Sequence, residues 1–190
     1  MSVLPDYLAP NLRVVFCGTA AGNRSAEVGH YYAGPGNEFW SLLYRSRIVP
    51  AALTPEQDDQ VLRFAVGLTD LAKKRSAGRD RDLSPDDFDV SGLAEKMQRY
   101  RPAWLAFHGK TSATIVSRSL GLGSHVALGL QAWTMGGVKV FVLPSASAAN
   151  RSTAHLEGRP TRLAWFEALE RELPRANMDL STSQRNREAR

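Results

Sequence analysis

The segment "LRVVFCGTAAG", residues 12–22, places an unbroken apolar run directly before two glycines that stand four residues apart. An apolar run that ends at glycine is typical of a buried strand in a parallel sheet, followed by a tight loop. The same pattern occurs in "WLAFHG" (104–109) and "VKVFVLP" (138–144), and more weakly in "AVGLTDL" (65–71). These segments predict a central, mostly parallel four-stranded sheet.

Helical patterns separate the predicted strands. They are "NEFWSLLYRS" (37–46), "PEQDDQVLRFA" (55–65), "SPDDFDVSGLAEKMQRY" (84–100), the stretch after Lys110, and "TRLAWFEALEREL" (161–173). Asn37 is placed to cap the first of these helices. Strands that alternate with helices predict an α/β fold with helices on both faces of the sheet, in three α/β/α layers. We expect a single domain over residues 1–174 and a flexible C-terminal tail over residues 175–190.

The composition excludes several kinds of site. The 190 residues contain one cysteine, Cys17, which excludes a disulfide framework, an iron–sulfur cluster and a thiolate zinc site. The histidines are too scattered in sequence to predict a metal site. They are His30, His108, His125 and His155. We therefore expect a protein that uses no metal and no cofactor.

The net charge of +5 at pH 7 favours a polyanionic partner such as DNA. No apolar window approaches the length that crosses a bilayer, and the N-terminal segment has no signal-peptide pattern. We expect a soluble, monomeric, cytoplasmic protein of a bacterial-type cytosol or nucleoid, with no membrane partner.

Ligands of open parallel sheets bind outside the carboxyl ends of the strands. This rule indicates four places: after Gly18, around Asp70, after Gly109 and after Pro144. Two motifs near these places do not carry the function that they suggest. "HGKTS" lacks the first glycine of a P-loop, because that position is Trp104, and "GLGSHVALG" has Val126 where a dinucleotide-binding fingerprint needs glycine. Lys110 is then either a contact to one phosphate at a helix start or an ordinary exposed lysine.

Several further landmarks follow the first strand in a fixed order. They are "GHYYAGPGNEFW" (29–40), "GLTDL" (67–71), "RDLSPDDF" (81–88), "HGK" (108–110) and "VLPSASAANR" (142–151). In this order the chain, from about residue 8 to residue 174, resembles the mismatch-specific uracil/thymine DNA glycosylases of the uracil-DNA glycosylase superfamily. The resemblance implies a base-excision repair enzyme that flips a nucleotide out of DNA and hydrolyses the N-glycosidic bond of deoxyuridine, without a lysine nucleophile.

The resemblance also implies a base pocket around the first loop. Tyr32 matches the aromatic residue that stacks on the flipped base, and backbone amides near Thr19 and Tyr32 match the groups that read the base edge. Gly18, Ala20 and Ser25 complete the expected pocket. From the residues alone, the two neighbouring tyrosines could equally be loop aromatics that pack on the core.

A second loop, "PSASAANR", is expected to hold the DNA backbone through Ser145 and Ser147. The position of the family's wedge residue is Ala149, which is too small to fill a vacated base stack. Either Asn150 or Arg151 is then the wedge, or wedging is weak and single-stranded DNA is a good substrate. The basic segment "KKRSAGRDR" adds Lys73 and Lys74 as candidate DNA contacts, with a solvated loop as the alternative.

The first motif of the family is usually G-I-N-P-G, and its asparagine positions the attacking water. Here Ala20 occupies that position, so we expect the catalytic group to have moved. Asp70 matches a pocket position of the family and is the candidate general base, although it could instead only cap a turn or pair with Lys73 or Lys74. His30 is either a second catalytic group or a structural histidine that fixes the loop.

Two other functions remain open. A chain without the asparagine could be a non-catalytic protein that binds uracil or damaged bases in DNA. A pocket enlarged by Ala20 could also admit another deaminated base, such as hypoxanthine.

Overall fold

The protein, described by a computed structural model over residues 2–148 and 156–175, is built around a five-stranded sheet with the order β2-β1-β3-β5-β4. The strands are β1 (Val14–Ala21), β2 (Val66–Ser76), β3 (Trp104–His108), β4 (Gly129–Met135) and β5 (Val138–Leu143). β1, β2, β3 and β5 run parallel, and β4 runs antiparallel to β5. The predicted parallel strands are all present, but the sheet has five strands and not four.

The strand that the sequence prediction missed is β4, at the edge of the sheet. Its side chains alternate between buried and accessible, with Leu130 exposed and Met135 buried, so it has no continuous apolar run. The signal that could have found it is the pair Gly136 and Gly137, which joins β4 to β5 with positive φ angles of 57° and 85°. Such a two-glycine turn is typical of a β-hairpin.

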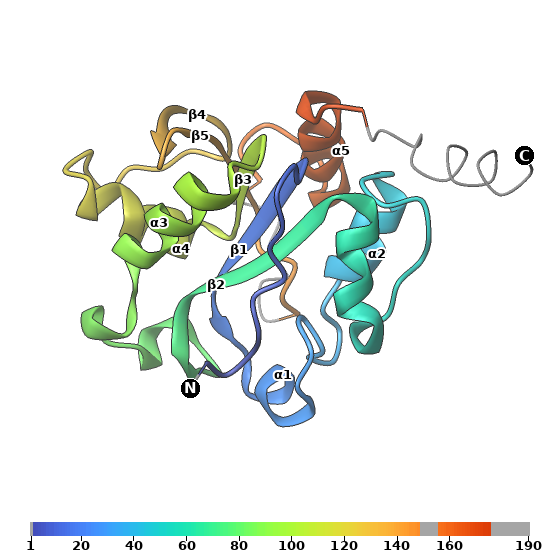
Figure 1. Cartoon of the computed structure of the whole chain (residues 1–190), viewed down its shortest axis with the longest axis horizontal. Coiled ribbons are helices and arrows are strands. Elements are labelled where there is room, and N and C mark those ends of the chain that lie inside the picture. The colour runs from blue at the N-terminus through green and yellow to red at the C-terminus, as the bar shows by residue number, and fades with distance from the viewer. Residues whose placement is uncertain (1, 149–155, 176–190) are drawn as a thin grey trace, which may run out of the picture.

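The helices form layers on the two sides of the sheet. They are α1 (Asn23–Val28), α2 (Phe39–Arg45), α3 (Val90–Tyr100), α4 (Lys110–Ser119) and α5 (Arg162–Glu172), with the 3-10 helices η1 (Pro55–Phe64), η2 (Asp80–Asp82) and η3 (Pro85–Asp87). Figure 1 shows α3 and α4 on one side of β1 and β2, and α2 and α5 on the other. The three-layer α/β/α prediction is confirmed.

Some helical predictions change in detail. The segment at 55–65 is a 3-10 helix, the segment at 84–100 divides into η3 and α3, and α1 lies in a region that we expected to be loop. The N-cap position of α2 is Glu38 and not Asn37. Asn37, one residue earlier, still contacts the start of the helix, because its side-chain oxygen accepts a hydrogen bond from the backbone N–H of Phe39 at 3.0 Å.

The core lies between the sheet and these helices. Phe16 on β1 is fully buried, packs edge-on against Phe39 of α2 with ring centres 5.3 Å apart, and stacks on Phe166 of α5 at 6.2 Å. Burial of one such side chain contributes about 1.5–3 kcal/mol to stability. This packing fixes α2 and α5 against β1, and so fixes the loops at the end of that strand.

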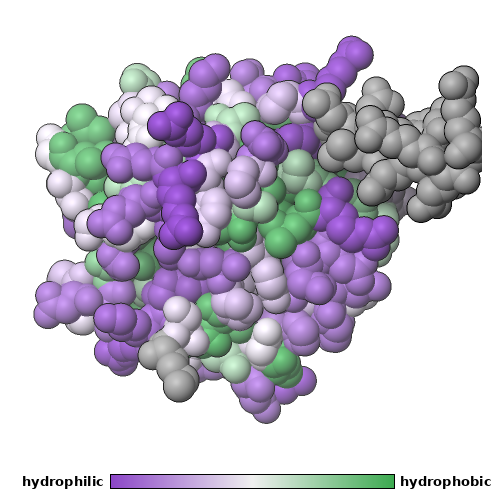
Figure 2. Space-filling view, viewed as in Figure 1, coloured by the Kyte–Doolittle hydropathy of each residue, from purple (hydrophilic) through white to green (hydrophobic). Residues whose placement is uncertain are grey.

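The outer surface is mostly hydrophilic in the view of Figure 2, with apolar residues in small separate patches. Within residues 2–148 and 156–175, no helix combines the length and the apolar character that crossing a membrane requires. Most of the expected C-terminal tail, residues 176–190, lies outside the described residues.

Candidate active site

A cleft of about 800 Å³ opens at the carboxyl ends of the parallel strands. Its lining includes Gly18 of β1, Asp70 of β2, Gly109 after β3 and Pro144 after β5. The four places indicated by the strand-end rule therefore meet in one cavity, because parallel strands all end at the same edge of the sheet.

Asp70 and Gly18 both line this cleft, on the neighbouring strands β2 and β1. They are paired in the register of β1 and β2. A Cβ atom on residue 18 would lie 2.5 Å from Oδ1 of Asp70, closer than any side chain allows. Glycine at position 18 therefore gives the Asp70 carboxylate its place against the β1 backbone.

Asp70 is only 4% exposed, and no described residue forms a hydrogen bond or an ion pair with its carboxyl group. Burial raises the pKa of Asp70 to about 7, a rise that Lys73 and Lys96 oppose and Asp6 reinforces. A carboxyl group with a pKa near neutrality is well suited to accept a proton from water. Within the described residues Asp70 therefore forms no ion pair with Lys73 or Lys74, although the charge of Lys73 still influences it.

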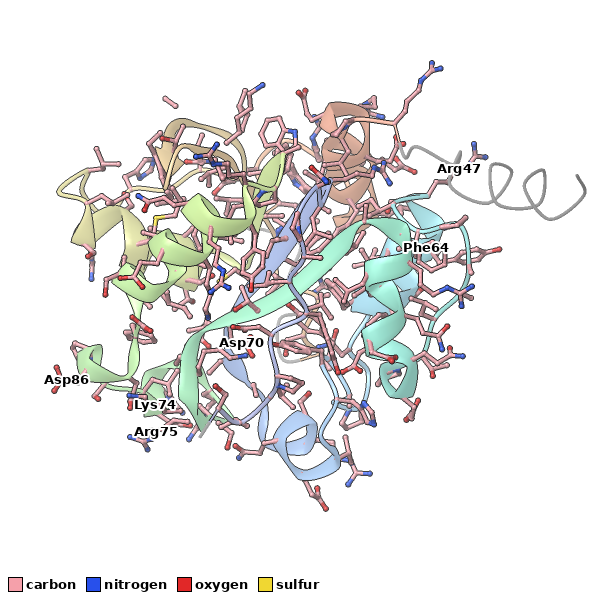
Figure 3. The ribbon with its side chains drawn as sticks, in the orientation of Figure 1. Arg47, Phe64, Asp70, Lys74, Arg75 and Asp86 are labelled. Atoms are coloured by element: carbon pink, nitrogen blue, oxygen red, sulfur yellow. The ribbon has the colours of Figure 1, made fainter. Side chains whose placement is uncertain are left out.

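Only 8% of Lys73 is exposed and its side chain is paired within the protein, which corrects its assignment as a DNA contact. Its side chain is buried, its Nζ atom lies 2.9 Å from a carboxylate oxygen of Asp6, and it donates a hydrogen bond to the Tyr31 hydroxyl at 2.9 Å. Lys74 is exposed. Figure 3 shows Lys74 at the outer end of β2, while Asp70 lies near the middle of the molecule, where β1 and β2 run together.

Tyr32 forms one wall of the cleft. Its ring stacks on Phe39 with centres 3.8 Å apart, and its backbone has a left-handed φ of 55°. Its hydroxyl is buried without a hydrogen-bond partner, 3.6 Å from the point where a Gly18 Cβ would lie. Burial raises the pKa of Tyr32 well above its ordinary value, and the nearby Asp70 adds to the rise, so the phenol is neutral. Tyr31 beside it is buried in the core.

His30 does not line the cleft. Its Nδ1 atom lies 3.2 Å from a carboxylate oxygen of Asp58, which also accepts hydrogen bonds from the Tyr31 backbone N–H at 2.8 Å and the Tyr7 hydroxyl at 3.0 Å. This geometry favours the interpretation of His30 as a residue that fixes the loop. Asp58, which the sequence prediction missed, organises the loop that ends in Tyr32.

Thr19, Ala20 and Ser25 line the cleft with Gly18 and Tyr32, so the structure brings together all the expected base-pocket residues. Thr19 can donate from its hydroxyl to Asp80, at 3.4 Å. The Ser25 hydroxyl oxygen accepts a hydrogen bond from the Ala33 backbone N–H at 3.0 Å. Ala20 contributes only a methyl group to this wall.

Another part of the cleft lining comes from the segment after β5. Ser145 and Ser147 line the cleft, and the Ser145 hydroxyl accepts a hydrogen bond from the Ser147 backbone N–H at 3.2 Å. The backbone of Ala146 is held on both sides: its carbonyl accepts from the Glu38 N–H at 3.0 Å, and its N–H donates to Nε2 of His108 at 3.1 Å. Ala149, Asn150 and Arg151 lie outside the described residues.

The basic side chains at the rim are paired with acidic ones. Lys110 lines the cleft and forms an ion pair with Glu157, whose second oxygen accepts from the Leu128 backbone N–H at 2.6 Å. The other rim pairs are Arg24 with Glu27 and Arg79 with Asp82. A phosphate that contacts these cations must therefore compete with a carboxylate.

His108, at the end of β3, also lines the cleft and was not among the predicted site residues. It is 8% exposed, and burial lowers its pKa to about 3, with the charge of Arg162 acting in the same direction. Its position directly before Gly109 is the signal that could have identified it. Within the described part of the chain, no group of three or more His, Cys, Asp or Glu residues is arranged to hold a metal ion.

The family model of the uracil DNA glycosylase superfamily matches residues 5–173. Among solved structures, the chain is similar to the solution NMR structure of a "putative Uracil DNA glycosylase" from Methanosarcina acetivorans, with 24% sequence identity and a TM-score of 0.58. That similarity covers 88% of this chain and 96% of the archaeal chain, and it supports the fold. The family match supports, at the level of the superfamily, a glycosylase that acts on DNA.

Proposed function

The chain belongs to the uracil DNA glycosylase superfamily, and from this membership we propose that it is a monofunctional uracil-DNA glycosylase. It hydrolyses the N-glycosidic bond of deoxyuridine in DNA, releases free uracil and leaves an abasic site. The observation that carries this proposal is the buried Asp70 carboxylate against Gly18, because it supplies a water-activating group in a cleft whose usual asparagine is replaced by Ala20.

In the proposed reaction, Asp70 accepts a proton from a water molecule as the water oxygen bonds to C1′ of the sugar. The bond between C1′ and N1 breaks, and its electron pair leaves with the base, which takes a proton from solvent. The carboxylate also stabilises the positive charge that develops on the sugar. Burial strengthens this electrostatic effect, because little water is present to screen the charge.

The flipped base is proposed to stack beside Tyr32, which Phe39 supports from behind at 3.8 Å. A base that stacks on an aromatic side chain gains about 1–3 kcal/mol, which offsets much of the cost of flipping. Gly18, Thr19 and Ala20 line the same cleft as Ser145 and Ser147, which supports base reading by the first segment and phosphate contacts by the second.

The direct test is release of uracil from end-labelled oligonucleotides, single-stranded or with uracil opposite adenine or guanine, followed by alkaline cleavage. We expect Asp70→Asn to lower the single-turnover rate by about 10²–10⁴-fold, with DNA binding retained. Asp86→Asn is the matched control, because Asp86 is an exposed aspartate away from the cleft. If Asp70→Asn cleaves as fast as the wild type, Asp70 is not the general base.

A wild-type protein that binds the uracil strand without releasing uracil would instead be a non-catalytic base-binding protein. A glycosylase for another deaminated base is a second candidate, favoured by the cleft volume of about 800 Å³ and the small side chain of Ala20. A hypoxanthine-containing strand, tested in parallel, distinguishes a purine substrate from uracil.

A further inference from the structure

The N-terminal segment of the chain covers the outer edge of β2, the last strand on its side of the sheet. The backbone N–H of Val3 donates to the Lys73 carbonyl at 2.7 Å, and Tyr7 and Leu68 exchange two backbone hydrogen bonds at 3.0 Å each. Figure 1 shows this segment, in dark blue, beside β2. The segment therefore lies along the strand that carries Asp70.

Asp6, within this segment, binds three side chains at once. Its carboxylate accepts a hydrogen bond from the Thr69 hydroxyl at 2.7 Å and forms ion pairs with Lys73 at 2.9 Å and Lys96 at 2.7 Å. Thr69 directly precedes Asp70 on β2, and Lys73 follows three residues after it. Lys96 belongs to α3. One carboxylate therefore joins the N-terminal segment, β2 and α3 next to the proposed general base.

Lys73 extends this network to the wall of the cleft. Its ammonium group donates to the Tyr31 hydroxyl at 2.9 Å, and that hydroxyl donates to the Pro5 carbonyl at 2.9 Å. Tyr31 lines the cleft, and its ring lies 5.9 Å from that of Tyr32, centre to centre. The contacts of Asp6 thus reach both the strand of the proposed base and the loop of the proposed stacking residue.

The charges of this network act on Asp70 in opposite directions. Lys73 and Lys96 favour the ionised form of Asp70, and Asp6 disfavours it. Burial acts to raise the pKa of Asp6, but the hydrogen bonds from the two lysines outweigh it and lower the pKa, so Asp6 is ionised at neutral pH. Two lysines and one aspartate leave one positive charge, and Asp6 cancels the other.

Apart from Asp70 itself, the buried titratable side chains that line the cleft, and the thiol next to them on β1, carry no charge at neutral pH. Burial raises the pKa values of this thiol and of two phenols, and it lowers the pKa of one imidazole to about 3. These groups are Cys17 on β1, Tyr31 and Tyr32 in the loop after α1, and His108 on β3. Arg79 and Asp80 also line the cleft, but they are exposed and carry opposite charges. Within the described part of the chain, the network of Asp6 therefore supplies the partly buried charges that act on Asp70.

We propose that Asp6 is a positioning residue of the cleft: it holds two lysines, Lys73 and Lys96, and cancels part of the positive charge that they exert on the proposed base. This inference rests on the proposed role of Asp70 as the general base. Without the charge of Asp6, the two lysines would make Asp70 a weaker base, and without the lysines Asp70 would stay protonated to higher pH. In the alternative interpretation, Asp6 only anchors the N-terminal segment.

The test uses two single variants and their combination. Asp6→Asn removes the negative charge and keeps an acceptor oxygen, while Lys96→Met removes one positive charge and keeps the length of the side chain. The double variant removes both charges and so restores the local sum of the wild type. Asp86→Asn and Lys74→Met are the matched controls, because both residues are exposed and neither pairs with Asp6. Circular dichroism melting establishes that each variant is folded.

Two quantities are measured between pH 5 and pH 9. The first is kcat/KM for uracil release. The second is the titration of the aspartate carboxyl groups by ¹³C NMR, in which the spectrum of Asp70→Asn identifies the Asp70 signal. The NMR titration requires no enzymatic activity.

We expect Asp6→Asn to move the Asp70 titration and the rise of kcat/KM to lower pH, because the negative charge that opposes ionisation is gone. The ratio of kcat/KM at pH 6 to kcat/KM at pH 9 should increase at least about threefold. Lys96→Met should move both to higher pH and lower this ratio by a similar factor. The double variant should return close to the wild type, and the controls should not move.

Opposite shifts separate the proposal from a purely structural role, which would lower the melting temperature or the rate without moving the titration in two directions. If the folded single variants titrate like the wild type, or both shift the same way, the proposal is wrong. If Asp6→Asn does not fold, Lys96→Met still decides, because an unchanged Asp70 titration in that variant overturns the proposal.

The NMR titration also separates this proposal from the glycosylase function. If the wild type releases no uracil but the Asp70 titration shifts in opposite directions in the two variants, the proposed reaction fails and the assignment of Asp6 stands. If the wild type releases uracil and the Asp70 titration does not move, the assignment of Asp6 fails alone.

Discussion

The Asp70 carboxylate lies against the backbone of Gly18 across the β1 and β2 pair, 2.5 Å from the point where a side chain on residue 18 would begin. Any larger residue at position 18 must displace the Asp70 carboxylate from its place in the cleft. This contact therefore requires glycine at position 18 as long as Asp70 keeps its place.

Gly18→Ala is expected to lower uracil release at least about 10-fold, because the added methyl group pushes Asp70, the proposed general base, away from the attacking water. We also expect a loss of about 1–3 kcal/mol in the free energy of unfolding, as for overpacking elsewhere. Gly22→Ala is the matched control, since its added Cβ meets nothing within 4 Å and its φ of −65° suits alanine. Equal activity of the two variants would show that the position of Asp70 is not critical.

The pH dependence of activity should follow Asp70. A general base must be deprotonated, and burial raises the pKa of Asp70 to about 7, so kcat/KM should rise with pH through about 7 and then level off. The measurement is uracil release between pH 5 and pH 9. If kcat/KM instead rises near pH 4, the ordinary pKa of a carboxyl group, the reaction depends on a different carboxylate.

Stability should change with pH in the opposite direction. The folded state holds the Asp70 proton up to about pH 7, while the unfolded chain releases it near 3.8, so the folded state binds more protons between these values. The contribution of Asp70 to the free energy of unfolding therefore falls by about 1.4 kcal/mol for each pH unit across this window. Asp70→Asn should remove this decrease in the free energy of unfolding, as measured by urea unfolding at pH 5 and pH 7.

Lys73 should affect stability more than DNA binding. Replacing it by alanine removes one of the two lysines that pair with the Asp6 carboxylate and one hydrogen-bond partner of the Tyr31 hydroxyl. Lys96 still pairs with Asp6, and Tyr31 still donates to the Pro5 carbonyl, so the expected loss in the free energy of unfolding is about 1–3 kcal/mol. The same change removes a positive charge that lowers the pKa of Asp70, so the rise of kcat/KM with pH should move to higher pH. Lys74→Ala, on an exposed side chain, is the control. A lower salt dependence of DNA binding in Lys73→Ala alone would restore Lys73 as a phosphate contact.

Variants of Tyr32 test whether the flipped base stacks on its ring. Tyr32→Phe removes a hydroxyl that is buried without a partner and keeps the ring on Phe39, so the folded protein should be equally or more stable. Tyr32→Leu removes the ring face and should weaken binding of uracil-containing single strands by about 5–150-fold, the equivalent of one lost base stack. If both variants bind like the wild type, the base does not stack on Tyr32.

His30 should prove dispensable for the chemical step. His30→Gln can keep a hydrogen bond to Asp58, and the position lies outside the cleft, so uracil release should stay within about threefold of the wild type. Asp58→Ala should lower activity more, because it removes the acceptor that also holds the Tyr31 backbone. A large loss in His30→Gln with normal melting would favour a catalytic histidine at position 30.

The sequence by itself determined the framework of the fold and the edge where the site lies. Continuous apolar runs ending at Gly18, Gly109 and Pro144 predicted parallel strands, and parallel strands must end at one edge, where their loops meet. The resemblance carried by several motifs in a fixed order identified the superfamily, which the match over residues 5–173 confirms. β4 escaped prediction because an edge strand with one solvated face has no continuous apolar run.

Only the tertiary structure decided which side chains share the cleft. Asp70 and Lys73 are three residues apart on one strand, yet Asp70 opens into the cleft while Lys73 is buried between Asp6 and Tyr31. His108 accepts a hydrogen bond at Nε2 from the backbone of Ala146, which is remote in sequence. Local patterns show where a chain turns or is buried, but hydrogen bonds and charges act through space, so their partners are known only once distant segments have packed together.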